Sequence, residues 1–190
     1  MVQLIEQTKG APLRLQRSVS ASPPSFDPQR ARVEFDASPF GGAALLYDHG
    51  ALSEWFALDW EDLPKLQVKT GLSKHQTFWE FLTLTLAIVR WCPVIEDLLI
   101  CGDNVASLQL ALSHKGKGEI APVSRELAWR VARGGWRYAV AHLPAEANVL
   151  ADRLSRLSDP SFPPLVQMPN ELEGAAQVNA RLDQLWSLPA

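Results

Sequence analysis

The sequence has few cysteines, no long apolar run and little net charge. Its two cysteines are too few for the disulfide scaffold of a small secreted protein. The longest apolar stretch, residues 78–89, contains Glu80 and is too short and too charged to cross a bilayer. No apolar run follows the basic residues near the start, as a secretory signal would require. These features predict an intracellular protein, in the cytoplasm or nucleus, with no membrane partner.

The net charge of −3 does not by itself indicate a polyanionic partner. The charges are nevertheless unevenly distributed, because acidic residues outnumber basic ones in 31–103 and basic residues outnumber acidic ones in 104–158. This division suits a protein that binds a cation with one part and a polyanion with another, although solvated surfaces can also produce it by chance. The apolar fraction of 47% is that of an ordinary globular protein and excludes disordered, collagen-like and coiled-coil chains.

Two clusters of serine and proline divide the chain into three parts. The first cluster covers residues 18–25 and the second covers residues 158–164. Such clusters without an apolar period are typical of linkers. We therefore predict a flexible linker over 1–30, a globular domain over 31–158 and a proline-rich tail over 159–190, with a short helix over 171–188.

Hydrophobic periodicity predicts an α/β domain with the element order βββαβααβα. Residues 32–38 alternate as a strand does, and a hairpin turn at 48–50 joins two further strands. An antiparallel meander followed by strand–helix units implies a mixed five-stranded sheet with helices on both faces. The strands are expected at 32–38, 43–47, 51–57, 98–101 and 136–143, and the helices at 76–91, 104–113, 122–133 and 148–157, the last capped by Asn148.

Four acidic residues are candidates for a functional role, because they lie at strand ends or in helices of the predicted domain. Asp36 ends the first strand, and Asp103 follows the apolar strand 98–101. Glu80 lies in a helix with almost no polar face, where an unpaired carboxylate costs several kcal/mol in typical transfer measurements. Asp152 lies opposite the leucine stripe of the last helix, so periodicity alone indicates a surface position. A carboxylate as buried as Glu80 needs a cation or a polar cavity.

Each acidic residue also has a simpler interpretation. Asp36 could end a turn, Glu80 could pair with Lys74 or Arg90, and Asp103 could cap the next helix. Taken together, however, acids at two strand ends and on two helices suggest a site for a hard cation, with oxygen ligands that suit Mg²⁺ or Mn²⁺. Two such ions are a common arrangement for phosphodiester hydrolysis.

Four sequence blocks carry a resemblance to a known family. Over 31–158 they make the chain resemble the ribonuclease H domain of reverse-transcribing elements, most of all the versions in DIRS-type retroelements and pararetroviruses. The chain departs from the family's pattern after Pro144, where the usual glycine is missing. The blocks are residues 33–38 with Gly41-Gly42-Ala43, residues 78–82, residues 102–108, and His142-Leu143-Pro144 followed by Asn148 and Ala151-Asp152-Arg153-Leu154-Ser155-Arg156-Leu157.

The resemblance implies an endonuclease that cuts the RNA strand of RNA–DNA hybrids. Asp36, Glu80, Asp103 and Asp152 would hold two Mg²⁺ ions, for which Mn²⁺ could substitute, and Asp36 would bridge them. His142 matches the family's mobile histidine and would relay protons or assist product release; alternatively it is a histidine that only closes the end of a strand.

Further residues are candidates for contact with the hybrid. Ser38 and Asn104 are placed to touch 2′-hydroxyl groups in the minor groove. The DNA strand would meet basic residues, each of which could also belong to a solvated helix face. These basic residues are Lys115, Lys117, Arg125, Arg130 and Arg133. Trp129, Trp136, Cys92 and Cys101 are interpreted as packing residues.

Partners and alternative functions follow from the same resemblance. We expect a monomer that works with a reverse transcriptase polymerase domain and can reside within a retroelement particle, although residues 1–30 are too short to contain that polymerase. One alternative is a DNA nuclease or transposase-like enzyme of the same fold. The other is a catalytically silent domain that tethers nucleic acid.

Overall fold

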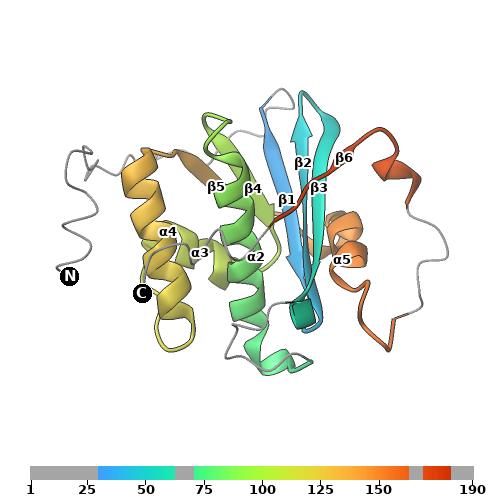
Figure 1. Cartoon of the computed structure of the whole chain (residues 1–190), viewed down its shortest axis with the longest axis horizontal. Helices are drawn as coiled ribbons and strands as arrows, with labels where there is room; N and C mark the ends of the chain where they lie inside the picture. Colours follow the sequence, from blue (N-terminus) through green and yellow to red (C-terminus); the bar gives the residue numbers. More distant parts are fainter. Residues whose placement is uncertain (1–29, 63–70, 163–168, 181–190) are drawn as a thin grey trace.

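The structure is a computed structural model that describes residues 30–62, 71–162 and 169–180. Most of the predicted linker, residues 1–29, lies outside the described residues, as do residues 163–168 and 181–190 of the predicted tail. The described residues form the mixed α/β architecture expected from the sequence (Figure 1). No helix among them is long and apolar enough to cross a bilayer.

A single mixed sheet forms the centre of the molecule, with the strand order β5-β4-β1-β2-β3-β6. The meander β1 (Arg32–Ala37), β2 (Gly41–Asp48) and β3 (Ala51–Asp59) is antiparallel. Strands β4 (Leu98–Gly102) and β5 (Tyr138–His142) continue the sheet parallel to β1. The carboxyl ends of β1, β4 and β5 therefore lie at one edge of the sheet.

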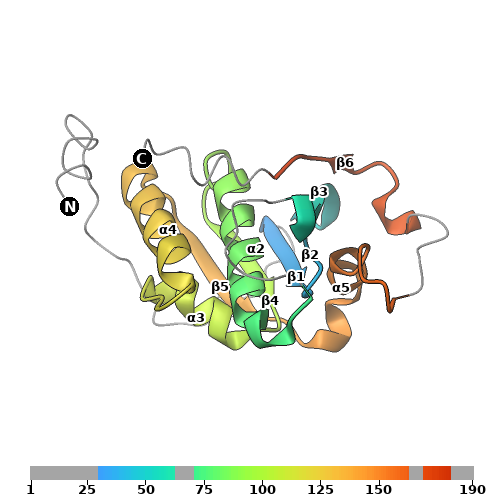
Figure 2. The ribbon, with the colours of Figure 1, turned by 60° about the horizontal axis from the view of Figure 1, so that its bottom comes forward.

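Helices cover both faces of this sheet, as predicted. Helices α2 (Gln76–Trp91), α3 (Val105–Ser113) and α4 (Ile120–Gly134) lie on one face, and α5 (Val149–Ser155) lies on the other (Figure 2). Alternate residues of β2 divide between two cores: Ala44 and Leu46 pack on the α2 side, whereas Ala43 and Leu45 pack with Leu154 of α5. Successive residues of β2 thus point to opposite faces of the sheet, and both faces are covered by apolar side chains.

The hairpin between β2 and β3 forms at the predicted turn. His49 and Gly50 have φ values of 49° and 81°, the positive values that a type I′ turn requires at both central positions. The turn pairs Asp48 with Ala51, and an irregularity between Leu46 and Tyr47 then shifts the register by one residue, so that Ala43 lies opposite Ala57 in β3. On its other side Ala43 lies opposite Asp36 in β1. The side chain of Asp36 consequently belongs to the face that carries α5.

Close packing at the start of β2 brings α2 against the end of β1. A Cβ atom on Gly42 would lie 2.3 Å from Thr83 Oγ1 and 2.6 Å from the Trp60 ring, so a side chain has no room there. Trp60 in turn stacks on Trp79 of α2, with ring centroids 4.9 Å apart. This approach places the first turns of α2, which carry Glu80, beside the carboxyl end of β1.

Within the described residues the sheet has six strands, where the sequence predicted five. The additional strand, β6 (Ala176–Gln177), pairs parallel to β3 at the edge of the sheet. Residues 171–180 are the described part of the segment expected to be helical, and they hold the end of the 3₁₀ turn η4 (Asn170–Leu172) and the strand β6. Leu172 is buried with Trp55 in the α5-side core. Burial of this leucine and pairing with β3 therefore outweigh the weak helical preference of the segment.

Asn148 does not cap the last helix in the way the sequence predicted. Its side chain makes no capping hydrogen bond to α5. Instead, its Nδ2 donates to the carbonyl oxygen of Phe35 at 2.8 Å, and the residue is buried. The amide therefore ties the start of α5 to the middle of β1, next to Asp36.

Candidate metal centre

Three of the four predicted acidic residues converge at the carboxyl edge of the sheet. Asp36 is the penultimate residue of β1, Asp103 directly follows β4, and Glu80 lies in the second turn of α2. One carboxylate oxygen from each lies within 4.8 Å of the others. Because β1 and β4 are parallel neighbours, their ends bring Asp36 and Asp103 together from 67 positions apart in the chain. This acidic triad is the candidate metal centre.

Glu80 leaves one buried oxygen without a hydrogen bond. The side chain is 2% exposed, and its Oε1 accepts from Gln76 Nε2 at 3.0 Å. Its Oε2 has no hydrogen-bond partner among the described residues. The ion pairs considered for Glu80 are not formed there, and Arg90 instead contacts Glu54 at 3.2 Å. A buried carboxylate oxygen of this kind calls for a cation.

Burial and the repulsion of neighbouring carboxylates disfavour the ionised forms of Asp36 and Glu80. Burial, with further contributions from the charges of Asp152 and Asp103, raises the pKa of Asp36 to about 7. Burial, followed by the charges of Asp36 and Asp103, raises the pKa of Glu80 well above its usual range. A divalent cation would compensate this repulsion, because oxygen ligands of negative charge suit hard ions such as Mg²⁺ and Mn²⁺. The residues present therefore fit such an ion.

Asp103 does not cap the helix that follows it, which was the simpler interpretation of this residue. The cap of α3 is Asn104, whose Oδ1 accepts from the backbone N–H of Ser107 at 3.0 Å. Asn104 thus uses this oxygen within its own helix, and it remains half-buried beside the triad. Because Asn104 caps the helix, the Asp103 carboxylate is available to bind a cation.

Asp152 lies beside the triad but is not one of its mutually close oxygens. It faces Asp36 closely enough to raise the pKa of Asp36. Its own Oδ1 is held by Arg156, with Nε and Nη2 each at 2.7 Å. The Asp152 side chain is 38% exposed, which is consistent with the surface position that periodicity indicated. The structure thus places this fourth acid at the rim of the centre, paired with an arginine.

Ser155 is a residue of the centre to which the sequence analysis gave no role. Its hydroxyl lies 2.6 Å from Asp36 Oδ2 and 2.9 Å from the carbonyl oxygen of Asp152. It is fully buried in the last turn of α5. Its position within the block 151–157 was the available signal, but nothing local to that block reveals contact with a strand 119 residues earlier.

Ser38 does not offer its hydroxyl to a ligand, contrary to the sequence analysis. The residue is 1% exposed, and its Oγ donates to the carbonyl oxygen of Ser155 at 2.7 Å. The same Oγ accepts from the backbone N–H groups of Phe40 and Gly41, each at 3.1 Å. The hydroxyl therefore organises the turn between β1 and β2 and fastens it to α5.

His142 reaches the same edge of the sheet as the triad. It is the last residue of β5, lies in register with Gly102 and is exposed. Gly102 immediately precedes Asp103, so β5 and β4 bring His142 and Asp103 to neighbouring strand ends.

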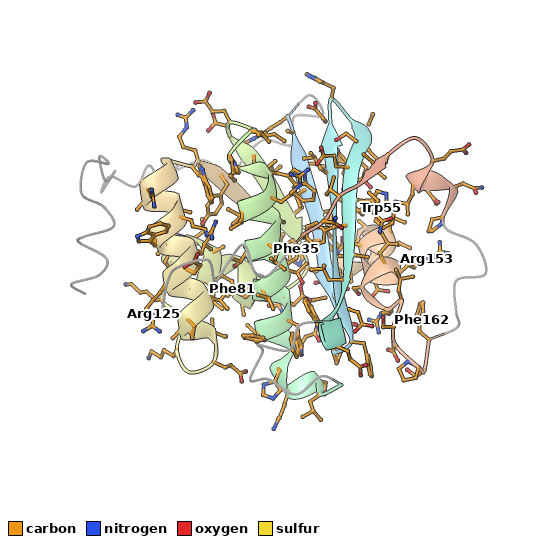
Figure 3. The ribbon with its side chains drawn as sticks, viewed as in Figure 1. Phe35, Trp55, Phe81, Arg125, Arg153 and Phe162 are labelled. Atoms are coloured by element: carbon orange, nitrogen blue, oxygen red, sulfur yellow. The ribbon has the colours of Figure 1, made fainter. Side chains whose placement is uncertain are left out.

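The predicted basic residues do not form one surface. Lys115 and Lys117 are exposed in the loop before α4, which a 2.7 Å contact between His75 and Glu119 ties to the start of α2. Arg125 is exposed near the start of α4 and appears toward the same end of the molecule (Figure 3). The beginning of α4 therefore presents positive charge toward the end of the molecule that carries Glu80.

Two of the predicted basic residues are engaged elsewhere. Arg130 pairs with the buried Glu126 at 2.7 Å. Arg133 lies over the Trp129 ring, 5.0 Å from its centroid, in the last turn of α4. It lines a cavity of about 500 Å³ together with residues at the end of α2 such as Cys92. Since α2 carries Glu80 in its second turn, Arg133 lies near the opposite end of this helix.

The cysteines behave as packing residues, as expected. Burial raises the pKa of Cys92 to about 12, and burial, followed by the charge of Glu34, raises that of Cys101 to about 11. Trp136 packs against the main core and likewise contributes to packing.

Comparisons with known proteins give two similar solved structures. No protein-family model and no curated protein matches this sequence. One similar structure is the RNase H1 from the halophilic archaeon Halobacterium salinarum NRC-1, with 15% identity, a TM-score of 0.48 and coverage of 68% of this chain and 96% of that chain. The other is LC11-RNase H1 in complex with an RNA/DNA hybrid, with 10% identity, a TM-score of 0.45 and coverage of 65% and 91%.

Proposed function

We propose that this protein is a metal-dependent endonuclease that hydrolyses the RNA strand of RNA–DNA hybrids, with the activity residing in residues 31–158. The observation that carries the proposal is the acidic triad, in which three carboxylates converge and one deeply buried oxygen has no described partner. The four sequence blocks that resemble ribonuclease H support it, because the residues of three blocks meet in this triad. The origin in a reverse-transcribing element and the polymerase partner are proposed on those blocks alone.

Asp36, Glu80 and Asp103 would hold a divalent cation, and Asp152 would contribute to a second position beside Asp36. We propose Mg²⁺ as the ion, with Mn²⁺ as a substitute. Bound divalent cations supply an activated water molecule and stabilise the charge on the departing oxygen in phosphodiester hydrolysis.

The chain's own groups hold these carboxylates in place. Gln76 Nε2 donates to Glu80 and to the carbonyl oxygen of Ala37, so it links α2 to the end of β1. The Ser155 hydroxyl lies against one oxygen of Asp36 and leaves the other for the cation. His142, exposed at the neighbouring strand end, would move protons or assist departure of the product.

Recognition of the hybrid would depend on its shape and its 2′-hydroxyl groups. The backbone of the turn at residues 38–42 and the Asn104 amide lie next to the acidic residues and are the proposed minor-groove contacts. The Ser38 hydroxyl is not among them, because it is buried. Lys115, Lys117 and Arg125 would meet the DNA strand through its phosphates.

The test of the proposed function is a cleavage assay on the full chain with Mg²⁺. An RNA–DNA hybrid with end-labelled RNA is compared with double-stranded RNA and duplex DNA, and products are separated on a denaturing gel. We expect products only from the RNA strand of the hybrid. Cleavage of duplex DNA would instead identify a DNA nuclease of the same architecture. Binding of the hybrid without any product, with Mg²⁺ or Mn²⁺, would identify a silent tether.

The double variant Lys115→Ala/Lys117→Ala is expected to bind RNA–DNA hybrids more weakly, whatever the base sequence of the hybrid. If each lysine contacts one phosphate, the slope of log affinity against log salt should decrease by about two. Fluorescence anisotropy in EDTA, which prevents cleavage, measures both quantities. The matched control is Arg133→Gln, at the other end of α4, which should retain the wild-type affinity and slope. Equal losses in both variants would contradict this placement of the DNA strand.

A further inference from the structure

A positively charged side chain at the end of α5 lies beside the candidate metal centre. Arg156 directly follows α5, and its Nε and Nη2 each lie 2.7 Å from Asp152 Oδ1. Both nitrogens converge on one carboxylate oxygen. A guanidinium in this position neutralises the charge of Asp152 as a bound metal ion would.

The charge of Arg156 also extends to the triad. The guanidinium interacts electrostatically with Asp36 as well as with Asp152, so it contributes to the charge balance of the centre. The triad already assembles three carboxylates for a first ion without Asp152. A second ion that used either oxygen of Asp152 would lie close to the positive charge of the Arg156 guanidinium and be repelled by it.

The pair is built so that it can open. The Arg156 side chain is 36% exposed and that of Asp152 is 38% exposed, and the two are four residues apart. Ion pairs of this kind on helices are weak, because water competes for both partners. Phe162 gives the displaced arginine a second contact, since its ring centroid lies 5.8 Å from the guanidinium carbon. A divalent cation can therefore displace Arg156 from Asp152.

We propose that Arg156 acts as a resident counter-cation, so that this protein binds one divalent ion at the triad and a second, weaker one only when Arg156 leaves Asp152. The inference rests on the proposed metal centre and makes its two ion positions unequal. Arg156 is a positioning residue in this account, because it acts on the metal through Asp152. Its neighbour Arg153, on the same helix, has no described contact with the acids and should not affect either ion.

The test is a titration of the full chain with Mn²⁺ in the absence of nucleic acid. Isothermal titration calorimetry and the electron paramagnetic resonance signal of free Mn²⁺ both measure the binding. The wild type should bind one ion, with a second at least about tenfold weaker. Arg156→Gln should strengthen the second binding by at least about tenfold and leave the first within about twofold. Asp152→Asn should retain the first ion and lose the second. The matched control, Arg153→Gln, should behave as the wild type.

Arg156→Lys keeps the test decisive if Arg156→Gln does not fold. Lysine retains the charge but lacks the fork that holds Asp152 with two nitrogens, so the second ion should still bind more tightly than in the wild type. Two ions of equal affinity in the wild type, or a second affinity unchanged in a folded Arg156 variant, would overturn the inference while leaving the metal centre intact. No Mn²⁺ binding at all would instead overturn the proposed function.

Discussion

Asp103→Asn is expected to abolish cleavage of the RNA strand while the fold remains intact. The substitution removes one of three charges that would hold the cation but keeps the shape of the side chain at the end of β4. A lost metal interaction worth several kcal/mol corresponds to a rate decrease on the order of 10³-fold. Initial rates on a labelled hybrid at saturating Mg²⁺ measure the decrease, and circular dichroism confirms the fold.

Asp97→Asn is the matched control, because Asp97 lies just before the other end of the same strand. Its φ of 57° is a conformation that asparagine also adopts, and its exposed carboxylate contacts Arg137 at 2.9 Å. The control should retain the wild-type rate. A large decrease in both variants would indicate damage to β4, and an unchanged rate in Asp103→Asn would show that the triad does not carry the activity.

Without a divalent ion, the acidic triad is expected to make folding less favourable as the pH rises. Asp36 has a pKa of about 7 in the folded chain, because of burial above all, against 3.8 for the group in the unfolded chain. Between these values the folded chain keeps a proton that the unfolded chain has released, so the contribution of Asp36 to stability is lost as the pH rises from about 4 to 7. The raised pKa of Glu80 acts in the same direction. Stabilisation by Mg²⁺, which needs the ionised carboxylates, should increase over the same interval.

Asp36→Asn isolates this effect. At pH 8 in EDTA the variant should melt at a temperature higher than the wild type by on the order of 5 °C, because it removes a buried charge from the triad. At pH 5 the difference should shrink, and Mg²⁺ should stabilise the variant less than the wild type at either pH. Thermal denaturation in EDTA and in Mg²⁺ at both pH values gives all four comparisons, with Asp97→Asn again as the control. A variant that is less stable than the wild type at pH 8 in EDTA would contradict the account.

The elements with strong local patterns were predictable from the sequence. The apolar run before Pro93 gave the bounds of α2 correctly, and the turn residues 48–50 located the hairpin. Helix α4 begins at Ile120, two residues before the predicted start, because Pro122 is accommodated in a first turn where its missing N–H is not needed. The two-residue strand β6 is too short to leave a pattern, so no periodicity could have located it.

The acidic triad was predictable for a related reason. Strand ends meet at one edge of a sheet, and a carboxylate in an apolar helix needs compensation, so Asp36, Asp103 and Glu80 were each indicated by their immediate neighbours in the chain. The resemblance had placed Ser38 against the hybrid, and the local pattern placed Asn148 at the start of the last helix with a capping side chain. Asn148 does occupy the N-cap position, but its side chain bonds Phe35, and the Ser38 hydroxyl bonds Ser155. Neither bond could be read from the local sequence, because these partners are 113 and 117 residues away.

The sequence by itself therefore determined the strands and helices between residues 32 and 155, the faces they bury and the four acids that were candidates for the metal centre. The tertiary structure decided that three of these acids converge and that Asp152 lies beside them. The tertiary structure alone decided how the centre is held: Ser155 against Asp36, Arg156 on Asp152, and Arg133 at the end of α4 remote from Lys115 and Lys117. The physical reason is that burial repeats with the period of each element and is written into its local pattern. A hydrogen bond between α5 and β1 depends instead on how two distant segments pack, and neither segment alone specifies that geometry.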